Sequence, residues 1–154
     1  MSTDETEMNL MFKDLEADEH FFSTPIDILA WSFGAHTNVK ENKLAIPKIQ
    51  NLSMTKYMSE LTPLFYKFIA NQRVFETVVF ESTNVNQSIK FLLHDVVITT
   101  VASGGSAGEN RLTENIHLDF KNIEIIYKDH MKENSKAVNS GSIENRNPLG
   151  SSRH

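Results

Sequence analysis

A long stretch of β-branched and aromatic residues between Arg73 and Tyr127 limits the fold more than any other feature of the chain. Such side chains suit a pleated surface, and alternation in steps of two predicts strands with one face toward a core. The pattern predicts strands over 73–82, 88–101 and 116–127. A fold built mainly from antiparallel sheet follows.

Two of these predicted strands change phase in the middle. In the strand over 88–101 the apolar side chains move from odd to even positions, which predicts a β-bulge at His94-Asp95. The strand over 116–127 changes phase near Lys121-Asn122 and predicts a second bulge. Because bulges bend strands, we expect a small β-barrel of two curved antiparallel sheets.

One helix is predicted beside this barrel. Thr62 is a suitable N-cap, Pro63 fits the first helical position, and Asn71 is a suitable end. The apolar residues between them recur on one helical face: Leu64, Phe65, Phe68 and Ile69. The predicted class is therefore mostly β, or α+β, with one flanking α-helix.

The segment over 26–33 predicts a further strand with two different faces. Leu29, Trp31 and Phe33 alternate on one side and are expected to face the core. The other side then carries Ile28, Ala30 and Ser32. That second face must meet either solvent or another molecule.

The 154 residues, of which 40% are hydrophobic, suffice for one core, and we expect a single domain over 1–129. Residues 130–154 are polar and lack periodicity, so they predict a flexible tail. For Leu149–His154 both a native and a vector-derived origin are open. No secretory signal or membrane-spanning run is present, which predicts a protein that is made in the cytoplasm and not inserted into a membrane.

Net charge and residue types exclude several classes of function. The 15 Lys and Arg against 20 Asp and Glu give a net charge of −5, which makes nucleic acid an improbable partner. There is no cysteine, no HExxH motif and no activated serine motif, so the chain predicts no metal site, no cofactor and no enzyme. The glycines between Gly104 and Gly108 precede a predicted strand instead of a helix, which favours a connecting loop over a phosphate cradle.

Three ordered segments carry a resemblance to a known family. Residues 26–34, IDILAWSFG, are followed by LSMTK at 52–56 with TPL at 62–64, and then by GGSAGENRLTENI at 104–116. Together they resemble the Hcp (haemolysin-coregulated protein) family of type VI secretion systems. The resemblance covers about 26–127, while the segment over 35–45 lacks the glycine run common in the family.

The resemblance implies a structural subunit that closes into hexameric rings, which stack into an inner tube. It also implies type VI sheath and spike proteins as partners, small effector proteins in the lumen, and secretion of the tube. Within this frame we expect Ile28, Ala30 and Ser32 to line the lumen. A loop and assembly network is expected from six residues of the third motif: Gly104, Gly105, Gly108, Glu109, Arg111 and Glu114.

Two rival functions stay open at this level. A ring-forming carrier or chaperone for effectors would share the fold but would not build long tubes, and the altered segment over 35–45 favours it. A small β-domain enzyme is the other rival, although no nucleophile, metal or cofactor motif supports it.

Overall fold

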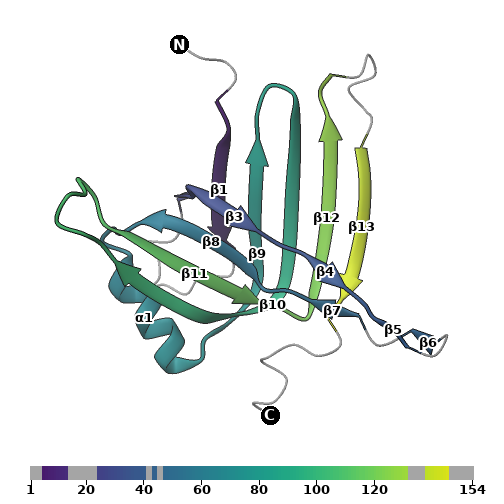
Figure 1. Ribbon diagram of the computed structural model, residues 1–154, viewed down its shortest axis with the longest axis horizontal. Coiled ribbons are helices and arrows are strands. Elements are labelled where there is room, and N and C mark those ends of the chain that lie inside the picture. The colour runs from purple at the N-terminus through teal and green to yellow at the C-terminus, as the bar shows by residue number, and fades with distance from the viewer. Residues whose placement is uncertain (1–4, 14–23, 41–42, 45–46, 132–137, 146–154) are drawn as a thin grey trace.

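The computed structural model describes residues 5–13, 24–40, 43–44, 47–131 and 138–145. Its main element is a nine-stranded antiparallel sheet in the order β2–β1–β9–β10–β11–β8–β3, with β12 paired to β10 and β13 paired to β12 (Figure 1). The strands of this sheet are β1 (Glu7–Phe12), β2 (Ile26–Asp27), β3 (Ala30–Ser32), β8 (Leu52–Tyr57), β9 (Val74–Thr83), β10 (Gln87–Gly104), β11 (Thr113–Asp119), β12 (Asn122–Asp129) and β13 (Val138–Glu144). The predicted mostly β class with one helix is confirmed.

Strand β10 belongs to two layers of the sheet. Its first part pairs with β12 as far as His94, and its second part pairs with β11 from Val97 onward. Asp95 lies between these parts with a φ of 55°, in the left-handed region. Figure 1 shows β10 turning there from the group that contains β12 and β13 toward β11 and β8.

The predicted bulge at His94-Asp95 takes a different form. In both β9 and β10 the buried side chains move from one set of alternate positions to the other at this level. The two strands therefore stay in register, with His94 paired to Thr77 and Val96 to Phe75. The register shift in β10 instead falls between Ile98 and Thr100, opposite β11. The second predicted bulge, near Lys121-Asn122, is instead a break between two strands. β11 ends at Asp119 and β12 begins at Asn122.

The sheet does not close into the predicted barrel. Its end strands, β2 and β3, are successive pieces of one segment and do not pair with each other. Between them, the Ile28 N–H donates to the Met8 carbonyl at 2.9 Å and the Leu29 N–H donates to the Thr55 carbonyl at 2.7 Å. The chain itself therefore crosses from one end of the bent sheet to the other.

Helix α1 (Thr62–Asn71) packs on this sheet by the predicted face. Phe65 and Phe68 are buried, and Leu64 and Ile69 pack against the core. The N-cap position is held by Leu61, one residue earlier than predicted. This shift leaves the Thr62 side chain free for a buried role described below.

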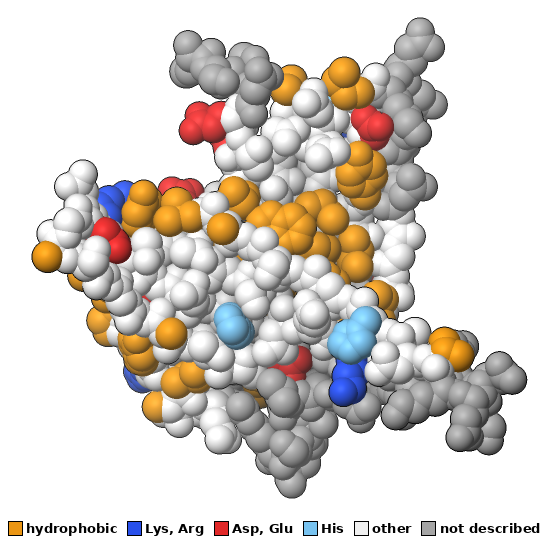
Figure 2. Space-filling view, viewed as in Figure 1, with side chains coloured by type: hydrophobic (Ala, Val, Ile, Leu, Met, Phe, Trp, Pro, Cys, Tyr) orange, Lys and Arg blue, Asp and Glu red, His pale blue; other side chains and the backbone are white. Residues whose placement is uncertain are grey.

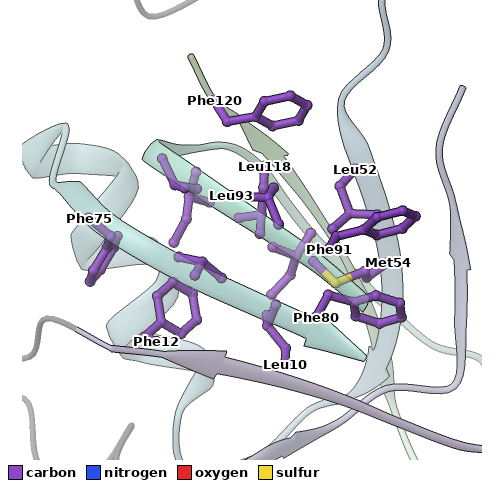
Figure 3. Packing of buried hydrophobic residues seen from close by; sticks show 14 of the residues in the cluster. Leu10, Phe12, Leu52, Met54, Phe75, Phe80, Phe91, Leu93, Leu118 and Phe120 are labelled. Carbon is purple, nitrogen blue, oxygen red and sulfur yellow. The ribbon is translucent and has the colours of Figure 1, made fainter. Parts of the chain in front are cut away.

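The core fills the space between the two layers and is rich in aromatic rings (Figure 3). Phe91 has its ring centroid 5.3 Å from that of Phe33, 5.4 Å from that of Trp31 and 6.0 Å from that of Phe80. Phe12 and Phe75 form a second contact at 4.6 Å, nearer the helix. These tilted and stacked pairs add to the burial of apolar area.

The prediction of a flexible tail over 130–154 is wrong for 138–144, which form β13. This strand pairs with β12 from Lys128↔Val138 to Asn122↔Glu144. Asn145 fastens its end: the backbone N–H donates to the Lys121 carbonyl, and the side-chain amide donates to Asp119 Oδ1 at 3.1 Å. The rest of the predicted tail, apart from 130–131 and 145, lies outside the described residues.

Residues 35–49 contain two small ladders that extend away from the main sheet (Figure 1). β4 (Ala35–His36) pairs with β7 (Lys48–Ile49), and β5 (Val39–Lys40) pairs with β6 (Lys43–Leu44). The segment over 35–45, which lacks the glycine run, falls in this region, and its described residues together with 47–49 form a projecting two-stranded arm.

Candidate functional site

A broad face of small uncharged residues covers the layer formed by β3, β8, β11 and the second part of β10. Cross-strand partners in an antiparallel sheet point to the same side, and the register places two rows together. The rows are Ala30, Thr55, Asn115 and Ala102, and then Ser32, Ser53, His117 and Thr100. We call these eight residues the polar face. All of them are exposed or half-buried.

The chemistry of the polar face is that of hydroxyl and amide groups. The Thr55 hydroxyl donates to Asn115 Oδ1 at 2.8 Å, so neighbouring strands are linked across the surface. None of the eight residues carries a formal charge at pH 7 with histidine neutral. Figure 2 accordingly shows a wide white area over β8 and β11 with few charged side chains. Such a surface can exchange hydrogen bonds with a partner and lacks an activated nucleophile.

The three residues predicted to line the lumen do not share one face of the sheet. Ala30 and Ser32 are exposed on the polar face, but Ile28 is only 5% exposed and belongs to the hydrophobic core. The reason is that 26–33 is not one continuous strand: the ladder changes from β1 to β8 between Ile28 and Leu29. The alternation restarts after the change, which leaves Leu29 39% exposed and Trp31 half-buried.

A buried ion pair lies on the opposite side of the same layer. Lys56 Nζ on β8 is 2.6 Å from Glu114 Oε2 on β11, and the two residues are 2% and 1% exposed. The Thr62 hydroxyl donates to the same carboxylate oxygen at 3.1 Å, and the Ser103 hydroxyl donates to Oε1 at 3.3 Å. Lys56 also donates to the Tyr57 carbonyl at 2.7 Å.

These contacts join β8, β10, β11 and the start of α1 at one point. A buried charge is tolerable only when it is paired and its remaining hydrogen-bonding capacity is used, as in this arrangement. Tyr66 extends the network outward through a 2.8 Å hydrogen bond shared with the Ser103 hydroxyl. The ion pair thus holds the helix against the sheet, on the side of β8 and β11 opposite to the polar face.

The predicted loop and assembly network divides into separate parts. Glu114 is buried with Lys56, whereas Arg111 is exposed and stacks its guanidinium 3.8 Å from the centre of the Tyr57 ring. Glu109 makes a local contact, accepting a hydrogen bond from the Ser106 hydroxyl at 3.1 Å. Arg111 was expected to lie among Glu109 and Glu114, but Glu114 points inward to Lys56. A role of these loop residues in assembly stays a prediction.

The three glycines of this loop have different surroundings. None of the described glycines has positive φ. At Gly105 a Cβ would overlap Cδ2 of Leu112, an exposed side chain that would have to shift. Gly104 and Gly108 have open space around them.

Sequence reasoning did not identify Lys56 and Thr62 as partners of Glu114. The available signal was that all three belong to the segments that carry the family resemblance, at 52–56, 62–64 and 104–116. Residues matched in separate motifs often meet in the fold, and here they meet through one carboxylate.

Among the described residues, no group of three or more His, Asp or Glu side chains is arranged to hold a metal ion. No helix in the described ranges has the length and apolarity needed to span a membrane. The described residues thus form a bent, mostly β sheet with one uncharged face, supported by an ion pair closed to solvent.

The comparisons with known proteins identify the family. The family model described as "Type VI secretion system effector, Hcp" matches residues 16–127. The chain therefore belongs to the Hcp family, a family of structural secretion proteins that self-assemble into rings and tubes in type VI secretion. Protein hcp1 of Pseudomonas aeruginosa is 27% identical over 132 residues, which cover 79% of this chain and 81% of that protein.

Solved Hcp structures share the fold. Hcp1 from Salmonella typhimurium matches with a TM-score of 0.67 at 15% identity, over 91% of this chain and 95% of that chain. A protein described as a type six secretion system protein matches with a TM-score of 0.69 at 16% identity, over 94% and 93%. Hcp1 from Flavobacterium johnsoniae gives 0.60 at 12% identity, over 90% and 99%.

Proposed function

We propose that this chain is a tube subunit of a type VI secretion system that closes into hexameric rings, stacks into a tube, and carries effectors in the lumen. The tube is assembled in the cytoplasm, works with sheath and spike proteins, and is then secreted. Membership of the Hcp family supports this function, and the free edge of β13 is the structural observation that carries it.

Within the described residues β13 pairs on one side only, with β12. An exposed edge strand is a template for pairing with another chain, and proteins that stay monomeric usually protect such edges with charge or proline. The middle of β13, Ser140 to Ile143, carries neither. In a closed ring each subunit can cover the edge of its neighbour, so that no edge remains exposed.

The first prediction concerns this edge. Introducing Ser140→Lys and Ser142→Lys together places like charges along β13 and should shift the hexamer toward the 17.5 kDa monomer. Size-exclusion chromatography with light scattering measures the mass, and circular dichroism confirms that the fold is retained. The matched control, Ala70→Lys with Asn71→Lys on the exposed end of α1, should remain hexameric.

One outcome would contradict ring formation, and another would contradict the role of β13 in it. A wild-type chain that is folded and strictly monomeric at tens of micromolar would exclude ring formation. A hexamer that survives the β13 charges unchanged would retain the ring but place its interface on another edge.

The second prediction concerns the polar face as the lumen wall. Ser32 is exposed on β3 and has no core neighbour to displace, so Ser32→Gln should preserve both the fold and the hexamer. The bulkier side chain should reduce the amount of effector protein that co-purifies with the ring. Asn71→Gln on α1 serves as the control for the same side chain elsewhere. Dissociation of Ser32→Gln into monomers would instead make the polar face a subunit interface.

A ring-forming effector carrier that does not build long tubes is the second candidate. The altered segment over 35–45, which lacks the family's usual glycine run and whose described residues belong to the two-stranded arm, is the observation that favours it. Negative-stain electron microscopy separates the two functions. Stacked tubes support the tube subunit, and single rings at every protein concentration support the carrier.

A further inference from the structure

Arg111 is an exposed cation at one end of the polar face. The cross-strand register continues this side of the layer by one more row, in which Tyr57 on β8 pairs with Thr113 on β11. The guanidinium carbon of Arg111 lies 3.8 Å from the centre of the Tyr57 ring. Figure 1 shows the loop between β10 and β11, which carries Arg111, at the end of the layer far from β12 and β13. The uncharged polar face therefore ends in a positively charged group on an aromatic ring.

The backbone beside Arg111 is fixed to β8. The Met58 N–H donates to the Leu112 carbonyl at 2.9 Å, which ties the loop to the residue that follows Tyr57. The exposed Leu112 side chain lies beside Gly105 in the same loop. A group that is held in place before binding loses less entropy when a partner arrives. Arg111 is held in this way both by the loop and by the ring.

No neighbouring charge uses the hydrogen-bond donors of Arg111. The charged residues nearest to it along the two segments are Lys56, Glu60, Glu109 and Glu114. Lys56 pairs with Glu114 beneath the surface, and Glu109 accepts a hydrogen bond within its own loop. Within the part of the chain that the structure describes, Arg111 forms no ion pair and no hydrogen bond. A contact with a ring face leaves the five N–H donors of a guanidinium available to a partner.

We propose that Arg111, held on the Tyr57 ring, determines which proteins the polar face retains by binding a carboxylate of an acidic effector. The inference rests on the function proposed above, which makes this face the wall of the lumen and an effector its partner. A guanidinium binds a carboxylate through two parallel hydrogen bonds, which a single ammonium group cannot reproduce. The exposed Leu112 adds apolar contact beside the charge. Arginine and tyrosine are also enriched among the residues that dominate binding energy at protein interfaces.

The net charge of the chain makes this role specific to direct contact. At −5 the protein repels an acidic partner at long range, so general attraction cannot explain its retention. The affinity should therefore depend on the geometry of the guanidinium as well as on its charge. In a hexamer six such groups surround one lumen, and several of them can bind a single acidic protein.

The test measures how a fluorescein-labelled 20-residue peptide of alternating Glu and Ser binds the full-length protein, by fluorescence anisotropy. A peptide of alternating Gln and Ser reports the contacts that need no carboxylate. Arg111→Met should weaken binding of the acidic peptide at least about fivefold and leave the neutral peptide unchanged. Raising the salt from about 50 to about 500 mM should weaken binding of the acidic peptide to the wild type, because salt screens an exposed ion pair.

The matched control is Lys67→Met on α1. Lys67 is exposed and lies away from the polar face, and its replacement removes one positive charge, as Arg111→Met does. This variant should bind the acidic peptide like the wild type. Arg111→Lys should bind it more weakly than the wild type although the net charge is the same. Tyr57→Leu should also weaken binding, whereas Tyr57→Phe, which keeps a ring face, should not.

Four results would overturn the inference. They are a wild type that does not bind the acidic peptide, an Arg111→Met protein that binds it unchanged, equal losses for Arg111→Met and Lys67→Met, and full affinity in Tyr57→Leu. Circular dichroism confirms that each variant is folded.

Light scattering on the same samples separates this inference from the proposed function. A monomeric wild type whose binding of the acidic peptide still requires Arg111 would contradict the ring while supporting the role of Arg111. A hexamer that Arg111→Met dissociates, with the affinity for the peptide unchanged, would make Arg111 a contact between subunits and overturn the inference.

Discussion

Replacement of Glu114 by alanine is expected to lower the free energy of unfolding by about 3–5 kcal/mol, the cost of leaving a buried charge without its partner. Lys56, 2% exposed, would then face a cavity in place of a carboxylate 2.6 Å away. The hydroxyls of Thr62 and Ser103 would lose the acceptor that they share. Urea denaturation followed by circular dichroism measures the loss.

The control for this prediction is a double variant, Lys56→Met with Glu114→Leu. Replacing both charges by apolar side chains of similar size removes the desolvation cost together with the attraction, so most of the lost stability should return. If Glu114→Ala unfolded at the same urea concentration as the wild type, the pair would not hold α1 to the sheet.

The second large effect is expected for Phe91→Ala, which should cost about 3–5 kcal/mol because it leaves a cavity among three other rings. Phe91 is 2% exposed and contacts Trp31, Phe33 and Phe80. Thermal and urea unfolding both report the change.

Two comparison variants make this prediction sharper. Leu92→Ala lies next in sequence on the opposite, half-buried side of β10 and should cost much less. Trp31→Ala should fall between them, because part of its ring is exposed even though it contacts Phe80 and Phe91. Equal losses for Leu92→Ala and Phe91→Ala would contradict the assignment of the core face of β10.

The strands from Val74 to Asp129 and helix α1 were predictable because their side chains repeat at the period of the element that they form. Phe65 and Phe68 are buried as the helical pattern requires. The phase change predicted in β10 also corresponded to a real bend. Whether such a bend closes a barrel depends on ladder contacts between β2 and β3, which no local pattern encodes.

β13 was missed because little of its stability comes from its own side chains. Ile143 packs against the core, while Ser140, Gly141 and Ser142 are exposed. Its position depends on the β12 ladder and on Asn145, which are tertiary features. A strand formed in this way has the composition of a loop.

The candidate site was predictable in part. Ser32 and Ala30 lie on the expected exposed face, but Ile28 does not. The reason is that the neighbouring strand changes from β1 to β8 between Ile28 and Leu29, which reverses the alternation of side chains. For the loop network, charge alone could not separate the buried Glu114 from the exposed Arg111. Glu114 lies on the side of β11 that faces the start of helix α1, whereas Arg111 lies in the loop before β11.

The pairing of β1 with β9 has a consequence for synthesis of the chain. Phe12 pairs with Val78 and Glu7 with Thr83, so β1 is made well before β9 and cannot form this ladder until β9 has been translated. At about 5–20 residues per second this delay lasts several seconds, during which Leu10 and Phe12 have no core to enter. The sequence before Phe21 contains seven Asp and Glu residues. Negative charges that flank an apolar strand oppose its aggregation, so the acidic start of the chain protects β1 until its partner emerges.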